Sequence, residues 1–108
     1  MRNAADSILG LIGLATKARK TVTGNDACGL AIKTAKSSLV ILAKDASENT
    51  KKPIIRMCET SKAILREFAS KEELGKYTGK PDRAVVAVMD PGFAKRLVEL
   101  IDKMNENE

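Results

Sequence analysis

The sequence predicts an α/β protein in which one sheet lies between two layers of helices. Segments with apolar residues at helical spacing alternate along the chain with short, mostly apolar runs that are typical of buried strands. The 108 residues match the usual size of one domain, and 44% hydrophobic with 31% charged residues is the balance of a globular protein. We therefore expect a single domain that comprises residues 1–108.

The first predicted helix runs from Ala4 to Ala15. Its apolar side chains recur every three or four positions, and Asn3 can cap its first turn. Gly10 and Gly13 lie within it, and each costs a helix about 1 kcal/mol relative to alanine. We expect these glycines to allow close packing against another element.

A short strand and a second helix follow. The segment from Lys20 to Thr23 is rich in β-branched residues and ends at Gly24, where the second helix begins. This helix has a wide apolar face and leaves Lys33 and Lys36 to the solvent. The apolar face comprises Ala27, Cys28, Leu30, Ala31, Ile32 and Ala35.

The middle of the chain predicts a buried strand and a third helix. Leu39 to Ala43 is an unbroken apolar run, which is typical of a strand covered on both faces. A polar loop from Asp45 to Thr50 leads into a helix over about Lys51 to Ser61. Pro53 then lies in the first turn, where its missing N–H removes no helical hydrogen bond.

The last part of the chain predicts two strands and two helices. The strands are Ala63 to Phe68 and Arg83 to Met89, with a short helix from Lys71 to Tyr77 between them. The final helix begins with Asp90 as its cap and Pro91 at its first position. Its buried stripe consists of Phe93, Leu97, Leu100, Ile101 and Met104.

The composition favours an anionic partner over catalysis. Nineteen Lys and Arg against fourteen Asp and Glu give a net charge of +5, which favours polyanions such as nucleic acid. The chain has no histidine, so it lacks the usual general base and the commonest zinc ligand. Its three aromatic residues are too few for a protein that stacks single-stranded bases. We expect no catalytic activity, no cofactor and no metal site, and recognition of folded RNA through shape and phosphates.

The cysteines and the apolar segments indicate a reducing compartment. Cys28 and Cys58 have apolar neighbours in predicted helices, so we expect small buried thiols rather than a disulfide or a reactive site. The sequence shows no signal-peptide pattern and no apolar run long enough to cross a bilayer. We therefore expect a cytoplasmic protein without a membrane partner.

The segment before the second helix has the outline of an anion site. Three cations between Lys17 and Lys20 precede the strand that leads through Gly24 into the helix N-terminus. First-turn amides have no acceptor within a helix, and they direct partial positive charge towards a nearby phosphate or base edge. Gly24 permits a positive φ or the close approach of a ligand. The structural alternative is that Gly24 is a turn residue, Asn25 or Asp26 caps the helix, and the cations are solvated.

Residues 13–46 read GLATKARKTVTGNDACGLAIKTAKSSLVILAKDA, with a glycine that opens the second helix. Together with the Glu73-Leu74-Gly75 turn and the Pro-initiated last helix, this stretch resembles the YlxQ-like bacterial branch of the ribosomal protein L-seven-Ae superfamily. Members of that superfamily bind RNA kink-turns. The resemblance implies a three-layer α-β-α sandwich around a mixed four-stranded sheet. It also implies that RNA docks at the N-terminus of the second helix, the preceding basic strand and the loop from Gly79 to Arg83.

The sequence departs from the family signature at the start of the second helix. There the family carries Asn and Glu, which read guanine edges in sheared G·A pairs, and a Lys one turn later. Without gaps, these positions hold Asp26, Ala27 and Leu30. A shift by one residue sets Asn25 and Asp26 against the Asn-Glu pair but leaves Gly29 for the Lys. The predicted RNA-binding residues are Lys17, Arg19, Lys20, Gly24, Asn25, Asp26, Lys33, Lys80 and Arg83.

Three classes of function remain open. The first is a monomeric binder of structured RNA, either kink-turn-like or ribosomal, with the ribosome as a possible partner and no small-molecule substrate. The second is a protein-interaction module that keeps the fold without kink-turn recognition. Leu30 distinguishes the first two classes. An exposed Leu30 beside Ala27 favours a protein-binding surface, whereas a buried Leu30 removes the reason to propose one. The third is a small enzyme that uses Asp45 or Asp90 after an apolar strand, although both can cap the helices that follow.

Overall fold

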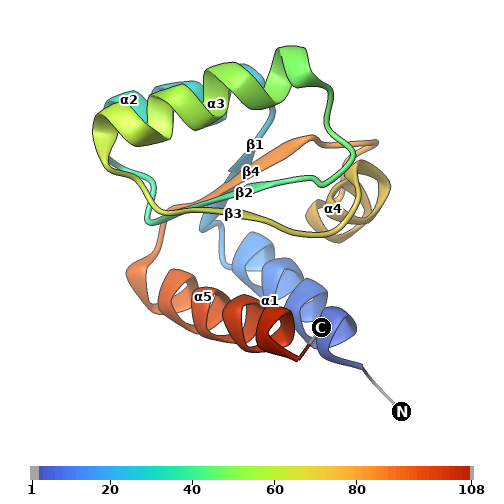
Figure 1. Cartoon of the computed structure of the whole chain (residues 1–108). Coiled ribbons are helices and arrows are strands. Elements are labelled where there is room, and N and C mark those ends of the chain that lie inside the picture. Colours follow the sequence, from blue (N-terminus) through green and yellow to red (C-terminus); the bar gives the residue numbers. More distant parts are fainter. Residues whose placement is uncertain (1–2, 108) are drawn as a thin grey trace.

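A mixed four-stranded sheet forms the centre of the computed structural model, which describes residues 3–107 (Figure 1). The strands are β1 (Thr21–Thr23), β2 (Leu39–Leu42), β3 (Leu65–Glu67) and β4 (Val85–Val88). They lie in the order β1-β4-β2-β3. This order makes β1 and β3 the edge strands. β4 is antiparallel to both of its neighbours, whereas β2 and β3 run parallel.

The two central strands are apolar along their whole length. Every residue of β2 and β4 is buried, as the unbroken apolar runs predict for strands covered on both faces. They belong to one core cluster that receives side chains from all five helices. The edge strand β1 is only half-buried, which leaves it next to the solvent.

Two layers of helices cover the sheet. α2 (Asn25–Lys33) and α3 (Glu48–Ser61) lie together on one face, and α1 (Ala4–Lys17), α4 (Lys71–Thr78) and α5 (Pro91–Glu106) cover the other (Figure 1). This arrangement confirms the predicted three-layer α-β-α sandwich around a mixed sheet. Within residues 3–107, no helix has both the length and the apolar character that a membrane span needs.

Capping side chains set the start of two helices as predicted. Asn3 Oδ1 accepts a hydrogen bond from the N–H of Asp6 at 2.8 Å at the start of α1. Asp90 Oδ2 accepts from the N–H of Phe93 at 2.9 Å, and Pro91 occupies the first position of α5. Both caps act within three residues, so the local sequence is sufficient to place them.

The third helix begins earlier than predicted. It starts at Glu48, after Ser47, rather than at about Lys51, so Pro53 lies inside the helix and not in its first turn. Because proline has no N–H, the carbonyl of Asn49 receives no helical hydrogen bond from it. Both residues are exposed, and water can satisfy that carbonyl, which makes the interior proline tolerable.

The second helix buries a narrower face than predicted. Cys28, Ala31 and Ile32 are buried, whereas Ala27 and Leu30 are exposed. A helix in an outer layer contacts its neighbours through one side only, so the remaining apolar residues of the predicted face stay in the solvent. Both residues lie shortly after the helix N-terminus, next to the predicted site residues Asn25 and Asp26.

Candidate nucleic-acid interface

The N-terminus of α2 forms an open corner at the end of β1. Gly24 occupies the cap position with φ 92° and ψ 160°, and no side chain caps the first turn. Asn25 and Asp26 are exposed and neither caps the helix, contrary to the structural alternative for them. Among the described residues, nothing accepts a hydrogen bond from the amides of Asn25, Asp26 or Ala27. Three backbone donors and the positive end of the helix dipole are therefore open to a ligand.

The loop of residues 79–83 lies beside this corner. Arg83 Nε donates to Thr23 Oγ1 at 3.2 Å, which attaches the loop to the last residue of β1. The Gly24 N–H donates to the carbonyl of Val85 at 3.2 Å, so β4 begins next to the start of α2. The Arg83 guanidinium also donates to the carbonyl of Asp82 at 3.0 Å. The fold thus joins two predicted site residues, Gly24 and Arg83, that are far apart in the sequence.

Gly75 allows the loop to fold back against α4. A Cβ at this position would overlap the carbonyl oxygen of Pro81, so only glycine permits the approach. The N–H of Lys80 donates to the carbonyl of Gly75 at 2.9 Å, and the N–H of Arg83 donates to that of Lys71 at 3.0 Å. Both ends of the loop are therefore held by α4, and the side chain of Lys80 remains exposed.

Three of the predicted cations lie away from the corner. The carbonyl of Lys20 accepts from the N–H of Met89 at 2.7 Å, just after the last residue of β4, whereas the N–H of Gly24 donates to Val85, the first residue of β4. The four steps from Lys20 to Gly24 span about 13 Å of strand, and Arg19 precedes Lys20. Lys33 lies in the last turn of α2, about 12 Å along the helix from its start. The predicted site therefore divides into two groups.

Lys17 belongs with the loop rather than with its sequence neighbours. It lines a groove of about 450 Å³ between α1 and α4, together with Lys76 and Gly79, the first residue of the loop. Lys76 is exposed, and its ammonium lies 5.8 Å from the centroid of the Tyr77 ring. Lys76 is not among the residues predicted from the sequence, although its place at the end of a predicted helix, shortly before a basic loop, was a usable signal. The positive surface thus continues from the loop into this groove.

Gly13 lies at the same α1–α4 contact, as its position in the helix predicts. A Cβ at Gly13 would lie 3.6 Å from the carbonyl oxygen of Tyr77, which is ordinary contact distance. The two helices are therefore close at this point, although an alanine would also fit.

Cations outnumber carboxylates around the corner and the groove. The described residues form two ion pairs, Lys51–Glu67 and Arg66–Asp102, and neither involves a predicted site residue. Four cations and two carboxylates border the corner and the groove. The cations are Lys17, Lys76, Lys80 and Arg83, and the carboxylates are Asp26 and Asp82.

The family model of the ribosomal protein L7Ae/L30e/S12e/Gadd45 family matches residues 6–98. The chain belongs to this family. Among curated relatives, the RNA-binding protein YlxQ of Bacillus subtilis (strain 168) is 44% identical over 92 residues, which is 85% of this chain and 92% of the relative. The RNA-binding protein YlxQ of Enterococcus faecium is 39% identical over 94 residues, which is 87% of this chain and 90% of the relative. The resemblance to the YlxQ-like branch is confirmed.

Solved structures share the L7Ae-type fold. A protein with unknown function from Bacillus halodurans C superposes with a TM-score of 0.84 at 36% identity, over 88% of this chain and 96% of that chain. The Giardia lamblia 15.5kD RNA binding protein superposes with a TM-score of 0.79 at 17% identity, over 98% of this chain and 91% of that chain. At 17% identity, this second similarity shows the fold alone.

This L7Ae-family chain presents Asp26, Ala27 and Leu30 on the solvent side of α2. All three are exposed, and Leu30 is 65% accessible. Leu30 also borders a shallow groove of about 250 Å³ with Val22 and Met89 beside the edge strand β1. The face therefore offers one carboxylate and two apolar groups, where the family resemblance implies an amide, a carboxylate and an ammonium.

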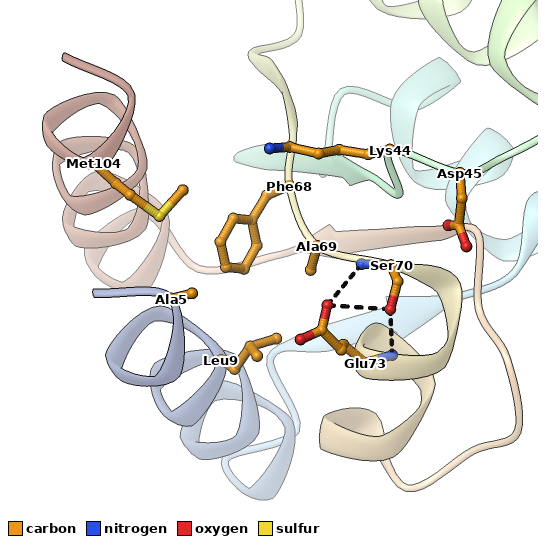
Figure 2. A pocket seen from close by; sticks show the side chains of 9 residues that line it. All are labelled: Ala5, Leu9, Lys44, Asp45, Phe68, Ala69, Ser70, Glu73 and Met104. Carbon is orange, nitrogen blue, oxygen red and sulfur yellow. Dashed lines mark hydrogen bonds between the residues drawn. The ribbon is translucent and has the colours of Figure 1, made fainter. Parts of the chain in front are cut away.

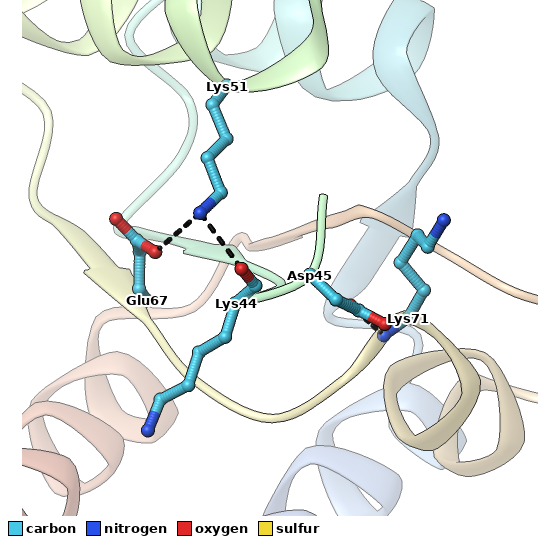
Figure 3. Close-up of polar contacts among 5 residues, drawn as sticks. All are labelled: Lys44, Asp45, Lys51, Glu67 and Lys71. Atoms are coloured by element: carbon cyan, nitrogen blue, oxygen red, sulfur yellow. Dashed lines mark hydrogen bonds and ion pairs between the residues drawn. The ribbon is translucent and has the colours of Figure 1, made fainter. Parts of the chain in front are cut away.

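The two aspartates considered for an enzyme have structural partners. Asp90 caps α5 as predicted, but Asp45 does not cap the third helix. Its Oδ1 accepts from the N–H of Lys71 at 2.8 Å, at the first residue of α4 (Figure 3). This happens because β2 and β3 are parallel neighbours, so the segments that follow them emerge side by side. Within residues 3–107, no three His, Cys, Asp or Glu side chains gather where they could hold a metal ion.

Both thiols are buried, as predicted. Burial raises the pKa of Cys28 to about 12 and also raises the pKa of Cys58. A thiol that stays protonated at neutral pH is a weak nucleophile and a weak metal ligand. These residues therefore contribute to the core rather than to a reactive site.

Proposed function

We propose that this protein binds structured RNA without catalysis, through the corner at the N-terminus of α2 and the cations of the adjoining loop. The observation that carries the proposal is the set of three open amides, from Asn25 to Ala27, beside Arg83. Amides at a helix N-terminus bind phosphates, and fixed donors also recognise acceptor edges of bases. Two relatives that match most of this chain are named RNA-binding proteins, which supports the same class of partner here.

A folded RNA, such as a kink-turn or a segment of ribosomal RNA, fits this surface better than a single strand. Phe68 is buried, and Tyr77 and Phe93 are half-buried, so none of the three aromatic rings is fully available for base stacking. The corner instead offers donors of fixed geometry, and the α1–α4 groove adds Lys17 and Lys76. A bent duplex can present phosphates from two strands to both places.

Recognition of bases by this surface differs from the pattern that the family resemblance implies. Asp26 can accept hydrogen bonds from base amino groups, whereas the side chains of Ala27 and Leu30 form no hydrogen bonds. We therefore propose that phosphate contacts supply most of the affinity, which makes binding strongly dependent on salt.

The experiment that tests the corner is replacement of Lys80 and Arg83 with alanine. Binding to a fluorescent kink-turn RNA and to a straight duplex of equal length is measured over a series of salt concentrations. Each lost phosphate contact lowers the slope of log K against log salt by about 0.9, so the double variant should lose about 1.8. The control replaces Lys52 and Lys95, which are exposed on α3 and α5, and should leave affinity and slope unchanged. Equal behaviour of the two double variants would exclude the corner.

A second experiment tests the other end of β1. Replacing Lys17, Arg19 and Lys20 together with alanine should also weaken binding and flatten its salt dependence. A variant that changes Lys17 alone separates the α1–α4 groove from the two cations near Met89. Full affinity of the triple variant would confine the interface to α2 and the 79–83 loop.

The exposure of Leu30 favours a second candidate function, a protein-interaction surface on the same helix. An exposed leucine beside an exposed alanine suits an apolar partner better than it suits RNA. Leu30→Lys distinguishes the two functions, because it adds a cation one turn from the open amides. RNA binding should strengthen in this variant, whereas a protein partner that survives ribonuclease treatment should be lost.

A further inference from the structure

The outer edge of β1 presents backbone groups that have no partner. The carbonyl of Lys20 and the N–H of Gly24 bond to the β4 segment at 2.7 and 3.2 Å. Because alternate residues of an antiparallel pair bond to the same neighbour, Thr21 and Thr23 direct their N–H and carbonyl groups away from β4. Within residues 3–107, no turn, loop or side chain bonds to these four groups. A sheet edge of this kind can pair with a further extended chain.

An apolar groove lies beside this edge on the α2 side of the sheet. Val22, Leu30 and Met89 line it, and its volume is about 250 Å³. The hydroxyl groups of Thr21 and Thr23 bond to α1 and to the loop after α4, so the side chain between them, that of Val22, points towards α2. Leu30 is 65% exposed although it borders the groove. An added strand would place every second side chain on this face.

Cations gather at the start of β1. Lys36 lines the groove together with Met89, and Met89 donates to the carbonyl of Lys20 at 2.7 Å, so both lysines lie at the same end of the edge. Arg19 directly precedes Lys20. These three cationic residues are exposed and form no ion pair within residues 3–107. This end of the edge therefore favours a negatively charged segment.

Carboxylates are few beside this edge. In the part of the chain that the structure describes, none lines the groove. Asp90 accepts from an N–H of α5, and Asp26 lies in the first turn of α2, at the far end of β1. The apolar cavity among α1, α4 and α5 is different, because Asp45 and Glu73 border it with one lysine, Lys44 (Figure 2). The groove beside β1 thus combines an apolar lining, a positive rim and an unpaired sheet edge.

We propose that the edge of β1 binds an extended acidic segment of another protein, which adds to the sheet as an antiparallel fifth strand. Antiparallel pairs are slightly more stable than parallel pairs, and their direction places the C-terminal end of the segment beside Lys20. An apolar side chain opposite Val22 enters the groove, and a carboxylate two positions later lies on the same face, near Lys20 and Lys36. The proposal rests on the protein-interaction function above and names its class of partner. A second copy of this chain lacks the pattern, because Gly24 lies two positions after Val22.

The test uses a fluorescein-labelled octapeptide, STTITDDS, and measures its binding to the full chain by fluorescence anisotropy. Its isoleucine matches the groove, and its aspartates match the cations at the start of β1. We expect a Kd of about 0.1 mM, and about ten-fold weaker binding of the reversed peptide SDDTITTS, whose charges would lie at the Asp26 end of the edge. Amide shifts in the isotope-labelled chain should centre on Thr21, Thr23 and Leu30.

Methylation of single peptide nitrogens tests strand pairing without any change in the protein. The two threonines beside the isoleucine pair with Thr21 and Thr23, so their N–H groups face β1, whereas the isoleucine N–H faces the solvent. An N-methyl group on the threonine before the isoleucine should weaken binding by about ten-fold or more, and one on the isoleucine by less than about two-fold. Equal effects of the two methyl groups overturn strand pairing, even where Leu30 binds a protein in another way.

Matched variants test the two side-chain contacts. Leu30→Ser should weaken peptide binding by about five-fold, whereas Leu14→Ser, at a leucine that is 56% exposed on α1, should leave the Kd unchanged. Lys36→Glu should weaken binding by about ten-fold and Lys52→Glu, on α3, should not, although both variants change the net charge equally. Equal effects within either pair overturn the proposal.

RNA binding of the same variants separates the two classes of partner. The proposal is overturned if the peptide does not bind up to about 1 mM, and in that case a loss of kink-turn RNA affinity in Lys36→Glu assigns these cations to the RNA interface. Lys80 and Arg83, which test the corner, do not line the groove, so the RNA proposal can fail while peptide binding persists.

Discussion

Replacing Gly24 with alanine should destabilise the protein through its backbone alone. Gly24 has φ 92° and ψ 160°, a conformation that residues with a side chain rarely adopt and that costs of order 1–3 kcal/mol. A Cβ at this position would meet no atom within 4 Å, so no clash with a neighbour adds to this cost. We therefore expect the free energy of unfolding to fall by about 2 kcal/mol.

Gly79 provides the matched control. It has φ 74° and ψ 29° at the end of α4, and a Cβ there would also meet no atom within 4 Å. Asparagine adopts this left-handed helical conformation more readily than other residues with a side chain. At the φ and ψ of Gly24 it has no such advantage over alanine. Gly79→Asn should therefore cost less than about 1 kcal/mol, whereas Gly24→Asn should cost as much as Gly24→Ala.

Urea unfolding followed by circular dichroism measures the difference. For an m value of about 2 kcal/mol/M, a loss of 2 kcal/mol moves the midpoint by about 1 M. The reasoning is refuted if Gly24→Ala lies within about 0.5 kcal/mol of the wild type, or if the two asparagine variants lose the same stability. An RNA-binding measurement on Gly24→Ala should show weaker binding, because relief of the strain moves the first turn of α2.

Three further predictions concern other parts of the fold. Gly75→Ala should lower the free energy of unfolding by about 3 kcal/mol or more, because its Cβ overlaps a carbonyl oxygen of the 79–83 loop. Gly29→Ala has its nearest contact at 3.6 Å, so it should be neutral or stabilise α2 by up to about 1 kcal/mol. Urea unfolding of both variants checks this difference. Burial raises the pKa of Cys28 to about 12, so its protonated thiol favours the folded state, and this stability is complete below the ordinary value of 9.0 and is lost as the pH rises towards 12. The Tm of the wild type should then fall more steeply above pH 9 than that of Cys28→Ala, and equal slopes would contradict the assignment. The hydrogen bond from Arg66 lowers the pKa of Asp102 from 3.8, so the stability that this pair contributes is present above pH 3.8 and is lost as the pH falls through the lowered pKa. Asp102→Asn should therefore reduce the fall in Tm at acid pH. An unchanged fall would count against a contribution from the pair.

The sequence predicts the parts of this fold that short-range interactions determine. Asn3 and Asp90 cap helices through backbone N–H groups that lie three residues further along the chain. The unbroken apolar runs of β2 and β4 indicate burial on both faces without reference to any distant residue. The start of α3 differs from the prediction because its first turn, Glu48 to Lys51, is entirely polar and lacks the apolar spacing that indicates a helix. Asp45 was misassigned because its partner, Lys71, is a neighbour only in the folded chain.

The same distinction explains the candidate site. Lys17 and Lys20 are close in the sequence, but Lys17 lines the α1–α4 groove, whereas Lys20 directly precedes β1, which leads away to Gly24. Lys76 joins the surface only because α1 and α4 pack together. Sequence proximity thus grouped cations that the fold separates, and it left out a cation that the fold brings in.

The geometry of the proposed interface depends on the backbone more than on the net charge of the chain. Gly24 leaves the first amides of α2 without a capping side chain, and Gly75 allows the loop to approach closely enough for Arg83 to reach Thr23. A methyl group at either glycine leaves every charge in place and still disturbs the corner. If both alanine variants retained full RNA affinity, general attraction between a basic protein and a polyanion would be sufficient, and the open amides would not be needed to explain binding.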